Sequence, residues 1–385
     1  MANGNIRPRG KKSYQIRIFL GRDKEGKQLF YTETVRGKKS VAEMRRAELL
    51  VQHGKGDLSQ VIRITVSDYL KKWLHDSVEG NVKRRTYYDY EDMVRRYIDG
   101  GIGNRLLSKL SPMDLQSFYK SLIERPLSAR TVRYVHNVLT RALRQAEAWG
   151  MVPRNVARLV DPPKGPRKKP PRALDFEQSE KFIDAVMNDR FYALWILALD
   201  SGMRPEEYLG LRWSDVDFKE RTVRIEQVLC LNRKGGGYYF DEPKTPESLR
   251  TLTVSQTTML ALQVHRREQN EARLQMGEDW ENLDLVFTNT IGGPVHHSNL
   301  HRRHFKPALV RAGLPSSVRI YDLRHTCATL LGVKGVRPKL IQARLGHSSI
   351  KTTMDIYSHV LREEGEIAGN VIESAILGKI ASRLG

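Results

Sequence analysis

Two stretches in the last third of the chain decide how this sequence is interpreted. The first is Tyr321-Asp-Leu-Arg-His-Thr326, and the second is Leu345-Gly-His-Ser-Ser-Ile-Lys-Thr-Thr-Met-Asp-Ile-Tyr-Ser-His-Val360. The first contains Arg324, and the second contains His347 and Tyr357. A single arginine or tyrosine is usually a solvated or packed side chain, so the interpretation depends on what else the chain supplies in order.

Two upstream segments supply the rest. Ser201-Gly-Met-Arg-Pro-Glu-Glu-Tyr-Leu-Gly-Leu-Arg-Trp-Ser-Asp215 places Arg204 at a predicted helix start, just after a turn formed by Gly202. Pro243-Lys-Thr-Pro-Glu-Ser-Leu-Arg250 follows the glycine-rich stretch 235–237 and carries Lys244 between two β-like runs.

These four segments, in this order and spacing, resemble the tyrosine recombinase family, most closely the integrases of phages and integrative elements. The resemblance extends over essentially the whole chain and implies a multidomain α+β fold. Residues 1–58 resemble an arm-type DNA-binding domain with a small β-sheet and a helix, and residues 62–160 resemble a helical core-binding domain. Residues 161–173 form a basic, proline-rich linker. Residues 174–385 resemble the mainly helical catalytic domain with a small antiparallel sheet, the DNA breaking-rejoining fold.

The resemblance also implies roles for individual residues. Cleaving a phosphodiester by displacement needs a nucleophile, cations around the phosphorane, and an acid for the leaving oxygen. Arg204 and Arg324 are expected to clamp the scissile phosphate, with a further hydrogen bond from His347. Tyr357 is expected to be the nucleophile, leaving a 3′-phosphotyrosine and a free 5′-hydroxyl.

Two more residues follow from the same resemblance. Lys244 is expected to protonate the 5′-oxygen, and Glu207 to brace the arginine cluster. Because the phosphotyrosine retains the bond energy, neither ATP, a metal nor any other cofactor is expected. The chain has no Gly-x-x-x-x-Gly-Lys-Ser/Thr loop. The histidines at 296, 297, 301 and 304 lack a carboxylate or cysteine at matching spacing, so we predict no metal site there.

One position departs from the family pattern. Histidine usually stands three residues before the second arginine, whereas this chain has Tyr321. A free phenol has a pKa of about 10 and cannot exchange protons near neutral pH as imidazole does. We expect Tyr321 to hydrogen-bond the phosphate or Tyr357, and His325 to pack structurally.

The charge is unevenly distributed along the 385 residues. The formal net charge is +21, and residues 1–173 hold 37 Lys and Arg against 17 Asp and Glu, whereas residues 174–385 hold 28 against 27. Such an excess favours a polyanionic partner. The predicted DNA-contacting residues lie in this first part: Arg7, Arg9, Arg17, Lys83, Arg84, Arg85, Arg130, Arg133, Lys168 and Lys169.

Composition also excludes several classes of protein. Only Cys230 and Cys327 are present, too few for a disulfide framework. The longest apolar stretch, residues 191–199, is shorter than the roughly 20 residues that span a bilayer. The first residues lack the apolar core of a signal peptide. We expect a cytoplasmic, nucleoid-associated protein without a membrane partner.

The predicted function is that of a site-specific DNA recombinase, an integrase that passes through a Holliday junction. Its partners are expected to be core-type and arm-type attachment sites, three further copies in a tetramer, a host DNA-bending protein and an excision factor. Two alternatives remain: a type IB-like topoisomerase with the same chemistry, or a non-catalytic excision or architectural factor.

Overall fold

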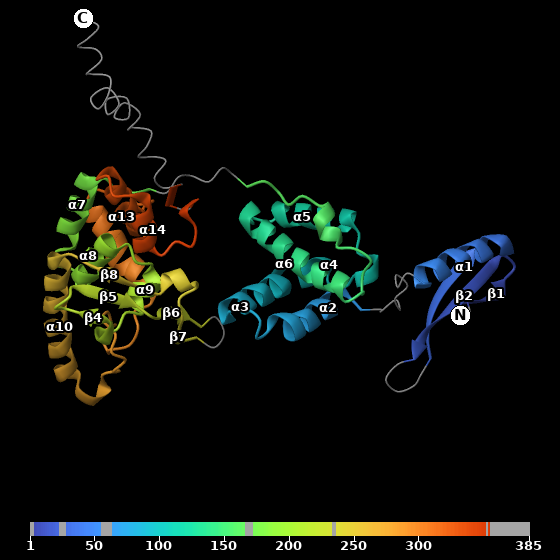
Figure 1. The fold of residues 1–385 in the computed structure, drawn as a ribbon, viewed down its shortest axis with the longest axis horizontal. Coiled ribbons are helices and arrows are strands. Elements are labelled where there is room, and N and C mark those ends of the chain that lie inside the picture. Colours follow the sequence, from blue (N-terminus) through green and yellow to red (C-terminus); the bar gives the residue numbers. More distant parts are fainter. Residues whose placement is uncertain are drawn as a thin grey trace, which may run out of the picture. The chain divides into compact units, whose positions relative to one another are not determined.

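The computed structural model describes residues 4–22, 28–54, 64–165, 172–232, 236–351 and 353–354, divided between a unit of residues 1–168 and a unit of residues 169–385 (Figure 1). The predicted residues Tyr357, Lys168 and Lys169 lie outside the described residues.

An antiparallel sheet with the order β1-β2-β3 begins the first unit, and helix α1 (Lys39–Gly54) packs on it. Its strands are β1 (Gly4–Gly10), β2 (Ser13–Arg22) and β3 (Gln28–Arg36). Ile16 and Ile18 are completely buried with Leu49 of α1, because alternate side chains of a strand point to the same face. The alternation of residues 13–20 predicts this face correctly.

Strand β1 is not predicted from the sequence, since it has no apolar alternation. It contains Pro8, which cannot donate a ladder hydrogen bond. Proline is tolerated here because β1 pairs only with β2 and is therefore an edge strand, with a register irregularity between Pro8 and Gly10.

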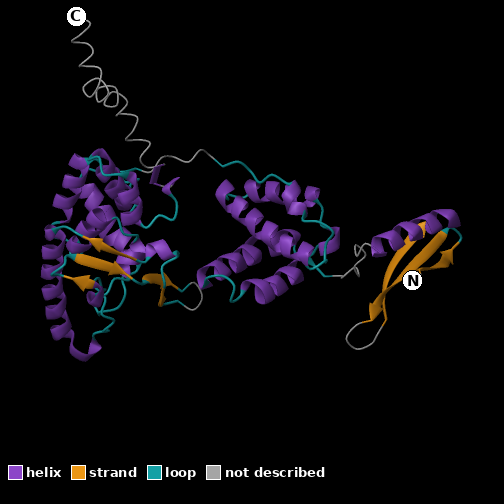
Figure 2. Ribbon diagram, in the orientation of Figure 1, coloured by secondary structure: helices purple, strands orange, loops and turns teal. Residues whose placement is uncertain are grey.

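Residues 64–160 are helical (Figure 2). Their elements are α2 (Val66–Trp73), η1 (Leu74–Val78), α3 (Arg84–Met93), η2 (Val94–Ile98), α4 (Asp99–Ile102), η3 (Leu107–Lys109), α5 (Pro112–Glu124), α6 (Ala129–Ala148) and η4 (Val156–Leu159). Ser111, followed by Pro112 and by Asp114 three positions on, predicts a capping box, and the structure confirms it: Ser111 and Asp114 exchange side-chain and backbone hydrogen bonds at the start of α5. The sequence also predicts that a helix opens at Ser128, and Ser128 caps α6. The buried Tyr69 hydroxyl donates to the Ala142 carbonyl at 2.5 Å.

The second unit is mainly helical, with short strands among the helices (Figure 2). Its elements are α7 (Phe176–Val186), α8 (Tyr192–Ser201), α9 (Pro205–Leu209), η5 (Trp213–Asp215), β4 (Val216–Asp217), β5 (Thr222–Ile225), β6 (Val228–Leu231), β7 (Tyr238–Asp241), η6 (Pro246–Ser248), β8 (Arg250–Thr253), α10 (Gln256–Met276), η7 (Gly277–Asp279), α11 (His297–Asn299), η8 (Leu300–Phe305), α12 (Lys306–Arg311), α13 (Asp322–Val333) and α14 (Pro338–Leu345).

Helix α8 lies at the centre of this unit and contacts α7, α10 and α13. It is almost entirely apolar, as a helix buried on several sides must be. One antiparallel sheet has the order β4-β5-β8, and β6 and β7 form a separate hairpin between β5 and β8 in the chain. Arg204 follows the end of α8, Arg324 lies in the first turn of α13, and His347 follows the end of α14.

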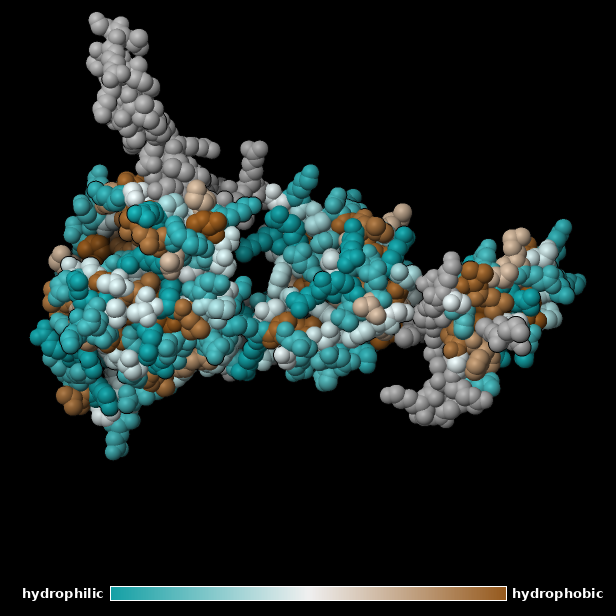
Figure 3. Space-filling model, in the orientation of Figure 1, coloured by the Kyte–Doolittle hydropathy of each residue, from teal (hydrophilic) through white to brown (hydrophobic). Residues whose placement is uncertain are grey.

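Hydrophilic side chains cover most of the visible face of both units, with apolar ones scattered among them (Figure 3). Within the described ranges, no helix is long and apolar enough to cross a membrane.

Candidate active site

Arg204 is held at the junction of two helices. Helix α8 ends at Gly202, whose φ of +65° is a left-handed conformation that favours glycine. A Cβ at Gly202 would also meet Leu345 Cδ2 at 2.5 Å. Arg204 then occupies the N-cap of α9, with Pro205 as the first helical residue. The predicted turn and helix start are therefore both present.

Glu207 lies buried beneath Arg204. Its Oε2 accepts a hydrogen bond from the Arg204 amide at 2.9 Å, and its Oε1 accepts one from Arg204 Nη1 at 2.5 Å. Its side chain is 1% exposed, against 28% for Arg204. Burial raises the pKa of Glu207, but the charges and hydrogen bonds of Arg250 and Arg204 outweigh it, so the pKa lies below its ordinary value. The carboxylate thus stays ionised and orients Arg204.

The guanidinium of Arg204 also contacts the end of α14 and the segment before β8. Its Nη2 donates to the Gly346 carbonyl at 3.1 Å, and its Nη1 also donates to Ser248 Oγ at 3.2 Å. Gly346 has a φ of +62°, and a Cβ there would meet the Glu247 carbonyl at 2.8 Å. The segment before β8 and the end of α14 therefore pack directly against each other.

Arg324, in the first turn of α13, is buried beside this cluster. It donates to the Gly202 carbonyl at 2.8 Å and to the Leu345 carbonyl at 2.6 Å. Burial, and next the charge of Arg204, lower the pKa of Arg324 to about 10, so the guanidinium remains charged at neutral pH. Arg204 and Arg324 thus bond consecutive carbonyls at the end of α14.

His347 follows Gly346 directly. Its Nδ1 is 3.0 Å from Thr353 Oγ1, and its amide donates to the Gln342 carbonyl at 3.1 Å. Burial, and next the charges of Arg324 and Arg204, lower the pKa of His347 to about 3. The imidazole is therefore neutral at neutral pH.

Lys244 is exposed and lies three residues beyond β7, on the segment that returns from the hairpin to β8. The next residue, Thr245, has its Oγ1 3.2 Å from Ser248 Oγ, which accepts from Arg204. The exposed lysine is thus carried by a segment that is bonded to the arginine cluster.

Tyr321 is the N-cap residue of α13, and its side chain packs beside His325. It is 38% exposed, and its ring packs edge-on against His325 with centroids 5.3 Å apart. His325 is partly buried, and its Nδ1 has no hydrogen-bond partner among the described residues. The packing of His325 agrees with the structural role predicted for it.

Those of the predicted DNA-contacting residues that the structure describes lie at surfaces of the first unit. Arg9 donates to Gln15 Oε1 at 3.1 Å, and Arg17 lies 4.0 Å from the centre of the Phe30 ring. Arg17 alternates with the buried Ile16 and Ile18, so it belongs to the face opposite α1. Arg7 is exposed on β1; the helical residues of the set are exposed at the first turns of α3 and α6: Lys83, Arg84, Arg85, Arg130 and Arg133.

Sequence reasoning missed Arg250. Its side chain is 7% exposed and pairs with Glu207 at 3.0 Å. It stands within the quoted segment that carries Lys244, but an arginine at the start of a strand has no feature in the sequence that distinguishes it from a solvated charge.

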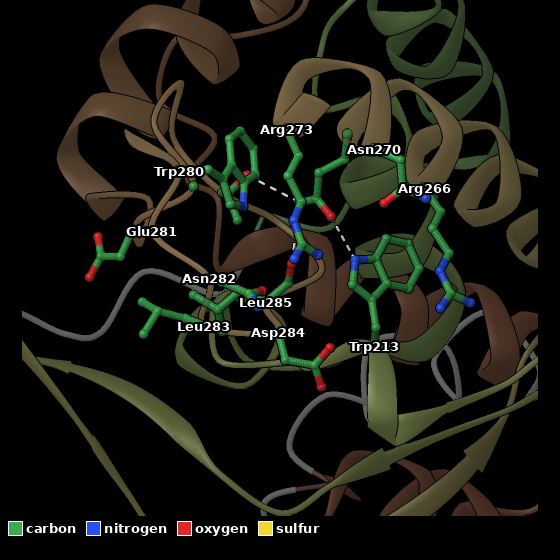
Figure 4. A pocket seen from close by; sticks show the side chains of 13 residues that line it. Trp213, Arg266, Asn270, Arg273, Trp280, Glu281, Asn282, Leu283, Asp284 and Leu285 are labelled. Atoms are coloured by element: carbon green, nitrogen blue, oxygen red, sulfur yellow. Dashed lines mark hydrogen bonds between the residues drawn. The ribbon is translucent and has the colours of Figure 1, made fainter. Parts of the chain in front are cut away.

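A pocket of about 100 Å³ lies elsewhere in the second unit (Figure 4). Trp213, Arg266, Asn270 and Trp280 line it, whereas none of the arginine cluster does. In the cluster itself, the side chain of Arg204 is 28% exposed, whereas those of Glu207, Arg250 and Arg324 are buried.

Comparisons with known proteins identify relatives over most of the chain. Residues 172–364 match the phage integrase family, and residues 65–123 match the N-terminal SAM-like domain of phage integrases. A tyrosine recombinase XerC-like protein of Caldanaerobacter subterraneus subsp. tengcongensis is 30% identical over 374 residues, covering 92% of this chain and 94% of that protein. An integrase of Streptomyces ambofaciens is 31% identical over 353 residues, covering 89% and 88%.

Solved structures share the fold. A Tn1549 transposon integrase in complex with transposon right end DNA matches with a TM-score of 0.67 at 23% identity, covering 79% of this chain and 100% of that one. A lambda integrase dimer bound to a core site matches with a TM-score of 0.55 at 17% identity, covering 92% and 94%. The sequence matches extend over both units, and the chain belongs to the phage integrase family, the tyrosine recombinases, which cleave and rejoin DNA.

Proposed function

We propose that this chain is a site-specific DNA recombinase that integrates a phage genome or mobile element and excises it again. The observation that carries the proposal is the cluster in which Arg204, Arg324 and His347 converge on the end of α14 around the buried Glu207. The guanidinium groups of Arg204, Arg250 and Arg324 against the one buried carboxylate of Glu207 leave a net positive site for a phosphate.

In the proposed reaction the Tyr357 hydroxyl attacks the scissile phosphorus. The bond from phosphorus to the 5′-oxygen breaks, and Lys244 gives that oxygen a proton. Arg204 and Arg324 neutralise the nonbridging oxygens. His347 is neutral. In the tautomer in which its Nδ1 accepts a hydrogen bond from the Thr353 hydroxyl, Nε2 carries the proton and can donate to the phosphate. Attack by the 5′-hydroxyl of a partner strand rejoins the DNA and releases Tyr357.

The DNA is held by the basic first part of the chain. Residues 1–58 would bind arm-type sites through Arg7, Arg9 and Arg17. Residues 62–160 would bind core-type sites, and the linker 161–173 would follow phosphates with Lys168 and Lys169. Residues 174–385 would form the catalytic domain. The exposed positions of Lys83, Arg84, Arg85, Arg130 and Arg133 support this assignment.

The full reaction needs more than one copy. We propose a tetramer on two duplexes that exchanges one pair of strands, passes through a Holliday junction and exchanges the second pair. A lambda integrase of the same fold has been solved as a tetramer bound to a Holliday junction. Chromosomal DNA in the cytoplasm would be the substrate, assisted by a host DNA-bending protein and an excision factor.

A nicked duplex tests the proposal, since the cut fragment diffuses away and traps the covalent intermediate. Wild type is expected to form a protein–DNA adduct without ATP or metal, and Tyr357→Phe to form none. No adduct from wild type, or one that survives in Tyr357→Phe, would contradict the proposal. Relaxation of supercoils without recombinant products would instead indicate a topoisomerase.

A further inference from the structure

Arg250 is a buried arginine that the proposed reaction does not use. It begins β8, and its side chain is 7% exposed. Its Nη1 and Nη2 donate to Glu207 Oε1 and Oε2 at 3.3 and 3.0 Å, as a two-pronged pair. Burying an arginine is unfavourable unless its donors are satisfied, so this pair and its further bonds hold the guanidinium in one place.

The same guanidinium connects three segments of the second unit. Glu207 lies on α9, three residues after Arg204. The Ser248 carbonyl, which accepts from Arg250 Nη1 at 3.0 Å, lies on the segment that carries Lys244. The Arg344 carbonyl, which accepts from Arg250 Nε at 2.8 Å, lies near the end of α14.

Arg250 and Arg204 share the oxygens of one carboxylate. Glu207 Oε1 accepts from Nη1 of both arginines, and Oε2 accepts from the Arg204 amide and from Arg250 Nη2. Arg204 is four times as exposed as Arg250, at 28% against 7%. Of the two guanidinium groups that pair with Glu207, that of Arg204 is the more exposed, and Arg250 bonds the same carboxylate from a more buried position.

We propose that Arg250 is a positioning residue for DNA cleavage, which through the Glu207 carboxylate holds Arg204 in the orientation that binds the scissile phosphate. The proposal rests on the proposed function, in which Arg204 contacts that phosphate. If Arg250 acts through Arg204, the effect of losing Arg250 on the cleavage rate should depend on the charge of the scissile phosphate. A structural role alone predicts no such dependence.

Arg250→Lys in the full chain tests this, because lysine keeps the positive charge but cannot donate two parallel hydrogen bonds to the Glu207 carboxylate as the guanidinium does. On a nicked duplex with an ordinary scissile phosphate, the rate of adduct formation is expected to fall about 100-fold, as for a catalytic group displaced by about 1 Å. On a duplex with a methylphosphonate at that position, one charged nonbridging oxygen is replaced by a methyl group. Neutralisation of this phosphate by Arg204 then contributes less to the rate, so the Arg250→Lys variant should form the adduct at a rate much closer to that of wild type. Arg204→Ala, which removes the phosphate-binding arginine itself, is the reference variant. Its rate relative to wild type should also be higher on the methylphosphonate DNA than on the ordinary DNA.

Arg212→Lys is the matched control. Arg212 makes an equivalent two-pronged pair with the buried Asp215, at 2.7 and 3.0 Å, and its remaining described bond goes to Glu226. This variant should cleave both DNAs at the wild-type ratio. Folding is checked by thermal melting, and DNA affinity is measured beside the rate.

The outcomes separate the two proposals. An Arg250→Lys variant equally slow on both DNAs would assign Arg250 a structural role only, and one with the wild-type rate would overturn the proposal outright. If that variant does not fold, Glu207→Gln breaks the same bridge, and failure of the methylphosphonate to relieve its loss would overturn the proposal. Absence of any wild-type adduct would contradict the proposed function instead.

Discussion

Glu207 is the residue on which the charge of the site depends, since it is the carboxylate that lies between Arg204 and Arg250. Its folded-state pKa is below the ordinary 4.5. Because the unfolded carboxyl group binds its proton at higher pH, the stabilisation from Glu207 is complete above about pH 4.5 and is lost as the pH falls through the folded value.

Glu207→Gln should therefore lower the free energy of unfolding by about 3 kcal/mol near neutral pH, because it leaves a buried charge unpaired. The variant should also lose less stability than wild type on acidification below about pH 4.5. Urea unfolding over this range measures both effects. Glu226→Gln is the control, since Glu226 is 43% exposed in its ion pairs and its loss should change little. A parallel pH dependence in wild type and Glu207→Gln would contradict the prediction.

Tyr321 is exposed and contacts His325 only through a ring edge. A histidine at this position could exchange protons near neutral pH, which a phenol cannot. Tyr321→His should therefore retain or raise the rate of adduct formation on the nicked duplex. Tyr321→Phe, which removes the hydroxyl alone, measures how much hydrogen bonding by the phenol contributes. A collapse of activity in Tyr321→His would mean that the phenol has a dedicated role.

At the residue scale, the sequence predicts those site residues that belong to a combination of motifs rarely found together by chance. Arg204, Arg324 and His347 come from three distant segments, and the structure brings them to one place. Arg250 was not predictable, because its value depends on a buried partner 43 residues away, a contact that only the packing of β8 against α9 and α14 creates.

At the scale of elements, the end of α14 packs closely against the segment before β8. Gly346 closes the helix in the left-handed conformation. A Cβ there would meet the Glu247 carbonyl at 2.8 Å and Arg250 Nη1 at 2.9 Å. The glycine thus serves both the helix cap and the approach of the segment that carries Lys244.

Gly346→Ala should cost stability twice over, about 1 kcal/mol for the backbone conformation and more for the contact with Glu247. Adduct formation should fall as well, because Gly346 also accepts a hydrogen bond from Arg204. Gly313→Ala is the matched control: Gly313 has a φ of +65°, yet a Cβ there meets nothing within 4 Å. Thermal melting and adduct assays compare the two. Equal losses in both variants would show that close packing at Gly346 is unimportant.

Elements with strong local signals are predicted from the sequence, whereas strand β1, which depends on its pairing partner, is not. The caps Ser111 and Ser128 mark the starts of α5 and α6 correctly, since a capping hydrogen bond is local. Strand β1, with Pro8 and no alternation, owes its conformation to β2. Nothing within residues 4–10 alone specifies that partner.

At the scale of the whole molecule, where the net charge is +21, the basic residues fall into two groups with different proposed roles. The first 173 residues carry nearly all of the excess, and the basic residues at the starts of α3 and α6 are exposed. The remaining residues are almost neutral, and their arginines at the candidate site are bonded to carbonyls and to Glu207. Bulk attraction to DNA and local stabilisation of a phosphate are thus assigned to different parts of the chain.

Salt dependence tests this division, because each phosphate neutralised by a protein cation contributes about −0.9 to the slope of log affinity against log salt. Residues 1–173 expressed alone should bind duplex DNA with a steep slope, and residues 174–385, which contain their own apolar core, with a shallow one. Fluorescence anisotropy across a salt series measures both. Exchanging Arg130 and Arg133 for alanine should reduce the slope of the first fragment by about 2 if each binds one phosphate. Equal slopes for the two fragments would mean that the folded contact surface does not follow the charge along the sequence.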